Sequence, residues 1–322
     1  MKLTFEQIKS ITFGALRVWQ EADGVHFANC TEKQAAAWDA LEPILGTRSR
    51  ATCGVRLDLH TDAKAFRFAF AAGGKAEVYI NGLFRAQIML EVGKWNEIAL
   101  CDALGAPLAE SRVTLVFPSH DPGVLAGAEL VDATVCTPHK HDRKMLFIGD
   151  SITQGWAALK DGFSYAWRVT RFFNAESVIQ GVGGGFFHES TFDTIDFDPD
   201  VVVIAYGTND WGHYATLDEL HAAADAFLSL IGKTYAGKKI FCISPIWRDI
   251  AFTEGGRKPM GKFEECRAAV IEEIEKHGFI HVDGLSLVPP MNEFYYDEYL
   301  HPNNEGFSHY AENLIPVMQK YL

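Results

Sequence analysis

The chain has 322 residues, of which 48% are hydrophobic and 22% are charged. Its length favours two domains, and its composition is ordinary for a globular protein. The 42 acidic and 29 basic side chains give a formal net charge of −13. Such a charge repels phosphate groups, so we expect neither nucleic acid nor an anionic membrane as a partner.

The chain start and the cysteines indicate a compartment. The first residues lack the uninterrupted apolar run of a secretory signal, and no stretch reaches the roughly 18 apolar residues of a membrane-spanning helix. We therefore expect a cytoplasmic protein. The six cysteines show no Cys-x-x-Cys spacing and several lie in apolar runs, so reduced thiols in the core are expected rather than disulfides or a zinc site.

Residues 1–138 are predicted to form a β-sandwich of jelly-roll type. One helical patch interrupts this half near residues 32–41. Apolar residues then alternate with polar ones in the segment 55–59, and again through Phe66, Phe68 and Phe70, which is typical of half-buried antiparallel strands. Asn81-Gly82 follows the apolar segment 78–80 and predicts a hairpin turn. A further strand at 113–117 ends at Pro118.

Residues 137–143 contain a proline and two histidines, His139 and His141, and are predicted to be a solvated linker rather than a metal site. Beyond them, residues 143–322 are predicted to form an α/β domain. Continuous apolar runs separated by amphipathic stretches favour a parallel sheet covered by helices on both faces, a three-layer, doubly wound, flavodoxin-like arrangement. The strands are expected at 145–148, 177–182, 201–206, 239–244 and 280–282, with helices at 217–235 and 262–277.

Polar residues follow several of these strands, at the sheet edge where α/β proteins bind ligands. Ser151 follows the first strand, a run of glycines at 183–185 follows the second, and Asn209 follows the third. His301 lies just before a final helix. Each motif alone is compatible with a helix cap or a turn. Together they predict ester cleavage, because Ser151 supplies a hydroxyl, His301 a base, and Asn209 and a glycine N–H two donors for the oxyanion.

This set resembles the SGNH hydrolases, also called the GDSL lipase/acylhydrolase family, over roughly residues 143–322. Gly-Asp-Ser-Ile at 149–152 matches the block that carries the nucleophile, here Ser151. Gly-Thr-Asn-Asp at 207–210 matches the block whose asparagine, here Asn209, is an oxyanion donor. Gly184 is the best match to the oxyanion glycine, with Gly183 and Gly185 left open. His301, followed by Pro-Asn, matches the block that carries the base.

The last block departs from the family pattern. The family has an aspartate three residues before the histidine, and this chain has Glu298 there, with Asp297 one residue further away. Three ways of orienting the His301 imidazole remain open: Glu298, which we favour, Asp297, or a backbone carbonyl beside a Ser–His dyad.

The expected substrate is a small-molecule acyl ester. A β-rich half joined to such a domain resembles the two-domain carbohydrate esterases, which implies removal of acetyl or other short acyl groups from a sugar. No metal or organic cofactor is implied. Lysophospholipase or thioesterase activity on longer chains is the alternative enzyme, and a non-catalytic carbohydrate-binding protein is the alternative class. The β-rich half could equally shape one wall of the cleft or form the contact of a homo-oligomer.

Two sets of side chains bear on the substrate. Arg248 is either a contact to a polar or anionic substrate or a solvated surface arginine. Five aromatic residues near the strand ends either line an acyl or sugar pocket or pack at its rim: Trp156, Phe186, Phe187, Trp211 and Trp247.

Overall fold

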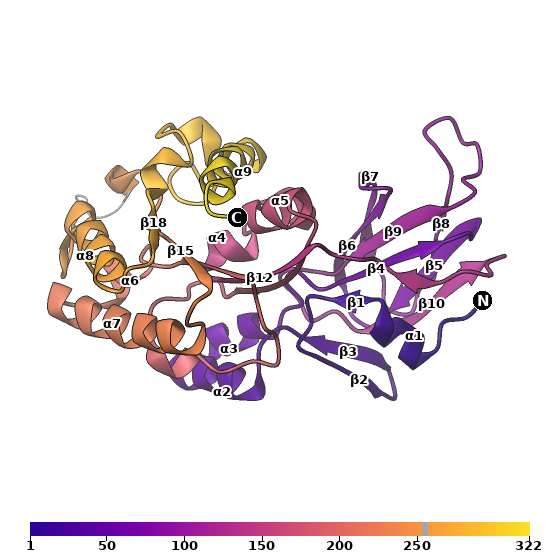
Figure 1. Ribbon diagram of the computed structural model, residues 1–322, viewed down its shortest axis with the longest axis horizontal. Coiled ribbons are helices and arrows are strands. Elements are labelled where there is room, and N and C mark those ends of the chain that lie inside the picture. The colour runs from indigo at the N-terminus through magenta and orange to yellow at the C-terminus, as the bar shows by residue number, and fades with distance from the viewer. Residues whose placement is uncertain (253–256) are drawn as a thin grey trace. The chain divides into compact units, whose positions relative to one another are not determined.

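The protein is described by a computed structural model that covers residues 1–252 and 257–322 and divides into two compact units (Figure 1). The first unit consists of Met1–Cys30, Arg50–His141 and Lys160–Gly162. The second consists of Thr31–Ser49, Asp142–Leu159 and Phe163–Leu322.

Two antiparallel sheets make up most of the first unit. One has the strand order β1-β4-β9-β6-β7, with β11 also paired to β4, and the other has the order β2-β3-β10-β5-β8. The strands are β1 (Thr12–Phe13), β2 (Arg17–Glu21), β3 (Gly24–Ala28), β4 (Arg56–Thr61), β5 (Ala65–Phe70), β6 (Gly74–Ile80), β7 (Leu83–Leu90), β8 (Asn96–Ala99), β9 (Ser111–Val116), β10 (Leu125–Val131) and β11 (Thr137–Pro138), and helix α1 (Phe5–Ser10) precedes them. The β-rich prediction is confirmed, whereas the jelly-roll connectivity stays a prediction.

Local sequence explains the turns and the core of this unit. Asn81 and Gly82 both have positive φ, 51° and 79°, the geometry that a tight hairpin between β6 and β7 requires. Apolar side chains of both sheets form one core, in which Phe66, Phe68 and Phe70 of β5 are fully buried. Burial of the apolar side chains in this core stabilises the unit.

The polar residues of β4 differ from the prediction. Alternation predicts that Arg56 and Asp58 face water, but they are only 1% and 0% exposed. Arg112 of β9 donates to both carboxylate oxygens of Asp58, at 2.9 and 2.7 Å, and Thr114 lies 3.2 Å from the same carboxylate. Paired charges of this kind can be buried because each has its opposite and its hydrogen bonds.

Residues 137–143, predicted to be a solvated linker, also differ from the prediction. Strand β11 pairs with β4, and the His139 backbone N–H donates to this strand. The His139 ring lies 2.9 Å from that of His60. The side chain of His141 is only 6% exposed, and burial lowers its pKa to about 3. The expectation of a solvated linker therefore holds only in part: Thr137, Pro138 and Lys140 are exposed, whereas the two histidines pack against the first unit.

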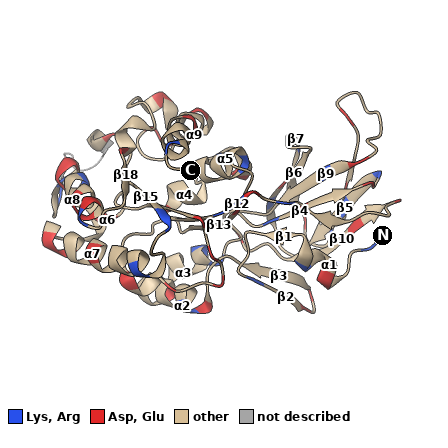
Figure 2. Ribbon diagram, viewed as in Figure 1, with Lys and Arg blue, Asp and Glu red and all other residues tan. Residues whose placement is uncertain are grey.

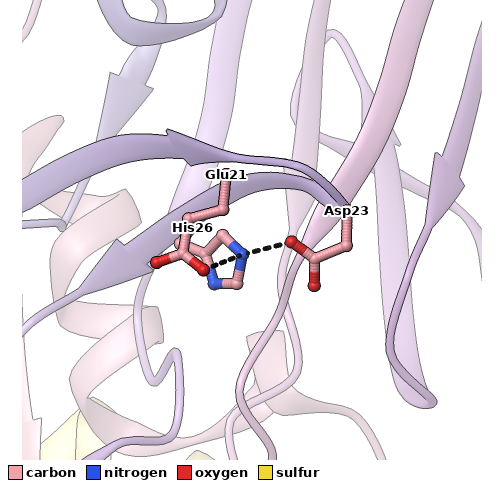
Figure 3. Close-up of side chains that lie close together, drawn as sticks. All are labelled: Glu21, Asp23 and His26. Atoms are coloured by element: carbon pink, nitrogen blue, oxygen red, sulfur yellow. Dashed lines mark hydrogen bonds and ion pairs between the residues drawn. The ribbon is translucent and has the colours of Figure 1, made fainter.

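The β2–β3 hairpin carries a surface cluster of Glu21, Asp23 and His26 (Figure 3). His26 Nε2 lies 2.8 Å from Asp23 and 3.8 Å from Glu21, and its ring stacks on Trp19 at 5.3 Å. Both carboxylates are exposed. The imidazole thus links the two ends of this turn through hydrogen bonding and stacking.

A parallel sheet with the order β13-β12-β14-β15-β18 forms the centre of the second unit. Its strands are β12 (Arg143–Gly149), β13 (Ala175–Gly181), β14 (Val201–Ala205), β15 (Lys239–Ile243) and β18 (Ile280–Val282), and they confirm the five predicted ones. In chain order this is 2-1-3-4-5, the flavodoxin-like order. A small ribbon pairs β16 (Arg257–Lys258) with β17 (Gly261–Lys262).

Helices cover both faces of the sheet, with α5 and α9 on one side and α7 on the other (Figure 1). The helices of this unit are α2 (Glu32–Leu41), α3 (Pro43–Ser49), α4 (Ser151–Gln154), α5 (Tyr165–Phe172), α6 (Asp210–His213), α7 (Leu217–Thr234), α8 (Phe263–Lys276) and α9 (Asn304–Gln319). Helices α7 and α8 lie within a residue of the predicted ones.

The two units exchange short segments, so the division into 1–138 and 143–322 needs correction. Helices α2 and α3 belong to the second unit: the buried side chains of Gln34 and Gln180 hydrogen-bond to each other at 3.1 and 3.0 Å. In return, the loop at 160–162 belongs to the first unit, where Glu77 of β6 accepts the backbone N–H of Asp161 at 2.6 Å. Neither contact is local in sequence, which is why chain order does not predict it.

The structure shows where the acidic residues and the cysteines lie. Acidic residues lie on α2, α7 and α8 (Figure 2). All six cysteines are free thiols; four of them are buried, whereas Cys101 and Cys136 are partly exposed. None of the helices in the described ranges combines the length and the apolar character needed to span a bilayer.

Candidate active site

Ser151 is the first residue of α4, directly after β12. The Asp150 carboxylate caps this helix by accepting the Ile152 N–H at 2.8 Å. The last residue of β12, Gly149, has no room for a side chain. A Cβ there would lie 2.1 Å from Thr153 Oγ1 and 2.8 Å from a carbonyl oxygen of β14. The turn holds Ser151 at the carboxyl edge of the sheet with 9% of its surface exposed.

A hydrogen-bonded chain runs from Ser151 through His301 to Asp297. Ser151 Oγ lies 2.9 Å from His301 Nε2, and His301 Nδ1 lies 2.6 Å from Asp297 Oδ2. Burial alone would raise the pKa of Asp297, but hydrogen bonds from the His301 ring and from backbone N–H groups hold it well below its usual range. An ionised carboxylate at Nδ1 places the ring proton there and leaves Nε2 as an acceptor for the serine hydroxyl.

The preference for Glu298 as the partner of His301 is therefore corrected in favour of Asp297. Asp297 Oδ1 accepts the backbone N–H groups of Leu300 at 2.8 Å and His301 at 3.0 Å, which folds the chain into a tight turn. Glu298 is exposed and has a φ of 67°. The turn directs the residue four positions before the histidine, rather than three, at the imidazole.

Of the three glycines after β13, Gly184 alone has a backbone N–H without a partner among residues 1–252 and 257–322. Gly183 donates its N–H to Gln154 Oε1 at 2.8 Å, and Gly185 donates to the Val182 carbonyl at 2.7 Å. No hydrogen bond of the described residues uses the Gly184 N–H. Gly184 has a φ of 88°, a conformation that favours glycine.

Asn209 follows β14, and its amide Nδ2 donates to the Gly185 carbonyl at 2.9 Å. This bond uses one amide hydrogen and leaves the second available to a ligand. Asn209 is half-buried. The structure thus brings the amide of Asn209 to the loop that carries Gly184, and their joint role as oxyanion donors stays a prediction.

Two buried aspartates support these loops. Asp210 accepts the N–H of Phe187 at 3.0 Å and that of Gly207 at 2.8 Å, which ties together the loops after β13 and β14. Burial raises the pKa of Asp210 to about 7. Burial also raises the pKa of Asp150 to about 7, and the charge of Asp210 adds to this effect.

Sequence reasoning missed Arg48, which α3 brings to the Gly184 loop. Arg48 Nη1 donates to the Gly183 carbonyl at 2.7 Å, and its guanidinium lies 5.8 Å from the centre of the Trp156 ring. That ring lies 6.3 Å from the His301 ring. No motif marks Arg48, because it lies about a hundred residues before the first catalytic block, in a half with a different periodicity.

Arg248 is neither fully exposed nor free. Its Nη1 donates to the Thr208 carbonyl at 3.2 Å, its guanidinium packs 5.1 Å from the Trp211 ring, and its Nε is buried without a hydrogen-bond partner among the described residues. Burial lowers the pKa of Arg248, although nearby acidic groups oppose the shift. The expectation of a solvated surface arginine is therefore wrong.

The five aromatic residues separate into two groups. Phe186, Phe187 and Trp211 are at most 2% exposed and pack in the interior. Trp156 is 41% exposed, and Trp247 is half-buried against the Tyr295 ring. Of these five described residues, only Trp156 and Trp247 can therefore offer a ring face to a ligand.

A second group of potential metal ligands lies away from these loops. Asp225, Glu273 and His277 bring ligand atoms within 4.8 Å of one another. Lys276 Nζ lies 2.9 Å from Asp225 and 3.0 Å from Glu273. The ammonium group already supplies the positive charge that an ion would bring, so this group is an ion-pair network between α7 and α8.

Comparison with known proteins identifies a family for this chain and solved structures with a similar fold. The profile of the GDSL-like lipase/acylhydrolase family matches residues 147–308, half of the chain. No curated protein matches the sequence. The matched range contains all the residues that the structure brings together around Ser151, except Arg48.

Several solved structures share the fold over both units. The salicylyl-acyltransferase SsfX3 of a tetracycline biosynthetic pathway is 17% identical, with a TM-score of 0.81 over 96% of this chain and 94% of that one. A family two carbohydrate esterase from Clostridium thermocellum, in complex with cellohexaose, is 17% identical, with a TM-score of 0.67 over 96% and 98%. An acetyl xylan esterase from Butyrivibrio proteoclasticus is 15% identical, with a TM-score of 0.65 over 100% and 98%.

Proposed function

The chain belongs to the GDSL-like lipase/acylhydrolase family, and from this premise we propose that it is a carboxylic ester hydrolase that uses Ser151 as its nucleophile. The observation that carries the proposal is the continuous hydrogen-bonded chain from Ser151 Oγ through His301 to Asp297, at 2.9 and 2.6 Å. A serine, a base and an oriented carboxylate in this geometry are the parts that acyl transfer requires.

The reaction runs in two halves. Ser151 Oγ attacks the ester carbonyl while His301 Nε2 takes its proton, and Asp297 stabilises the imidazolium that forms. The negative charge on the carbonyl oxygen is received by the N–H groups of Ser151 and Gly184 and by the Asn209 amide. His301 then passes its proton to the leaving alcohol, which leaves the acyl group on Ser151. A water activated by His301 attacks this acyl-enzyme and releases the carboxylic acid.

The proposed substrate is an acetyl or other short acyl ester of a carbohydrate. Support comes from the fold over both units, which is shared with proteins whose names give a carbohydrate esterase and an acetyl xylan esterase. The partly exposed ring of Trp156, 6.3 Å from the His301 ring, could stack on a sugar face. Hydrolysis of esters with longer acyl chains is the competing assignment. Such a substrate needs an extended apolar groove that binds the acyl chain along its length.

The test combines a nucleophile variant with a matched control. Ser151→Ala should abolish hydrolysis of acetylated sugars and of p-nitrophenyl acetate while the melting temperature stays nearly constant. Ser190 is the control, because its Oγ also lies 2.9 Å from a histidine nitrogen, that of His188, yet it is exposed and outside the site. Ser190→Ala should keep full activity. Turnover retained by Ser151→Ala would overturn the proposal.

A fluorophosphonate probe gives an independent readout. Peptide mass spectrometry should find the adduct at Ser151 and not at Ser190, whereas a non-catalytic sugar-binding protein would not be labelled. A series of p-nitrophenyl esters from acetyl to decanoyl then decides the acyl length. Activity that falls with length supports the short-acyl assignment, and activity that rises supports the lipid alternative.

A further inference from the structure

Arg48 contacts the same peptide group that carries the proposed oxyanion donor. Its Nη1 donates to the Gly183 carbonyl at 2.7 Å. The carbonyl of residue 183 and the N–H of residue 184 belong to one planar peptide unit. A guanidinium therefore binds the oxygen of the unit whose N–H is unused by the rest of the described structure.

Close packing holds Arg48 in this place. A Cβ on Gly183 would lie 3.4 Å from Arg48 Cδ, and a Cβ on Gly184 would lie 3.1 Å from Arg48 Nη1. The guanidinium also lies 5.8 Å from the centre of the Trp156 ring. Arg48 is half-buried, and its side chain hydrogen-bonds to the Gly183 carbonyl. The two glycines thus allow the arginine to approach the loop backbone directly.

This contact has an electrostatic consequence for the N–H at the far side of the peptide. A cationic donor on a carbonyl oxygen draws electron density toward that oxygen and makes the N–H of the same unit a stronger donor. The hydrogen bond also fixes the plane of the peptide and hence the direction of the N–H. Both effects stabilise the substrate oxygen more strongly when negative charge develops on it, that is, in the transition state.

We propose that Arg48 is a positioning residue of the oxyanion site, which orients and polarises the Gly183–Gly184 peptide so that its N–H receives the charge formed when Ser151 attacks. The inference rests on the proposed function and assigns to the inserted α2–α3 segment a part in the reaction. Arg48 acts through the peptide and does not itself touch the reacting atoms.

The test separates a transition-state effect from substrate binding. Arg48→Met removes the charge and the donor but keeps a long apolar side chain. We expect kcat on p-nitrophenyl acetate to fall about ten- to a hundredfold, less than the loss of a whole oxyanion donor, while KM stays within about threefold. Arg48→Lys keeps a cation that can reach the carbonyl and should recover part of kcat. The rate of fluorophosphonate labelling should fall in parallel, because the phosphoryl oxygen occupies the same site.

Lys33→Met is the control, since it removes one positive charge from the same helical segment. Lys33 is 68% exposed and pairs with Asp193, so its variant should match the unaltered protein. A rise in KM at constant kcat, or an unchanged kcat in Arg48→Met, would overturn the proposal. If Arg48→Met unfolds below the assay temperature, the same comparison of kcat with KM is made on Arg48→Gln and Arg48→Lys. Failure of the proposed function would show separately, as absent labelling of Ser151 in the unaltered protein.

Discussion

Replacement of Asp297 by asparagine tests the corrected carboxylate most sharply. Asp297 Oδ1 accepts three backbone N–H groups, those of Tyr299, Leu300 and His301, at 3.3, 2.8 and 3.0 Å. An asparagine that turned its NH₂ toward these donors would lose about three hydrogen bonds, of roughly 1 kcal/mol each. The oxygen of the introduced amide therefore stays on the backbone, and its NH₂ faces His301 Nδ1.

That orientation reverses the tautomer of His301. Nδ1 must then accept, so the ring proton moves to Nε2, which can no longer take the proton of Ser151. In serine triads this replacement costs about 10⁴ in kcat, or about 5.5 kcal/mol in the activation free energy. We expect a loss of about 10³ to 10⁴ for Asp297→Asn in steady-state hydrolysis of p-nitrophenyl acetate.

Glu298→Gln is the matched control for this experiment. Glu298 is exposed, so its variant should keep at least half of the activity. Glu298→Gln should unfold at the temperature of the unaltered protein. Asp297→Asn should unfold at a somewhat lower temperature, because the ionised carboxylate that stabilises the native state is lost while the backbone hydrogen bonds of the turn are retained. Near-full activity of Asp297→Asn together with a large loss in Glu298→Gln would refute the assignment.

Two further predictions concern the supporting residues. Burial raises the pKa of Asp150 to about 7, above its value of about 3.9 in an unfolded chain, so the native state binds the extra proton and stability should fall as pH rises from about 4 to 7. Asp150→Asn keeps the capping oxygen, and its urea midpoint should fall less steeply between pH 5 and pH 8; identical slopes would contradict this. Gly184→Ala places a Cβ 3.0 Å from Leu45 at a φ of 88°, so kcat should fall at least tenfold. Gly237→Ala, at a φ of 81° in open space, should share the backbone strain and keep kcat, and equal losses in both variants would argue for strain alone.

Local patterns predict most of the fold. Apolar runs and helix periodicity give the five parallel strands and the two long helices within about two residues, because each pattern reflects burial of a single element. The hairpin at Asn81-Gly82 is equally local, since it depends on two residues that tolerate positive φ. These local patterns do not reveal that helices α2 and α3 belong to the second unit and the loop at 160–162 to the first.

The candidate site shows the same limit at the level of side chains. Ser151, Asn209, Gly184 and His301 are predictable because each follows a strand or precedes a helix within a short motif. The choice between Asp297 and Glu298 depends on a turn that three backbone N–H groups create, and spacing alone does not reveal that turn. Burial of polar residues on β4 likewise depends on Arg112 of β9, a strand that pairs with β4 but lies far from it in the sequence.

The exchanged helices also set an order of events during synthesis. Arg48 is separated from its partner Gly183 by 135 residues. At about 5–20 residues per second, a ribosome needs roughly 7 to 27 seconds to add that stretch. Throughout this interval Trp38 and Leu45, buried in the finished unit, lack Val182 and Phe186, the residues with which they form an apolar cluster. The nascent chain therefore exposes these two apolar side chains until the loop after β13 has been made, which makes the α2–α3 segment a point for chaperone contact or misassembly.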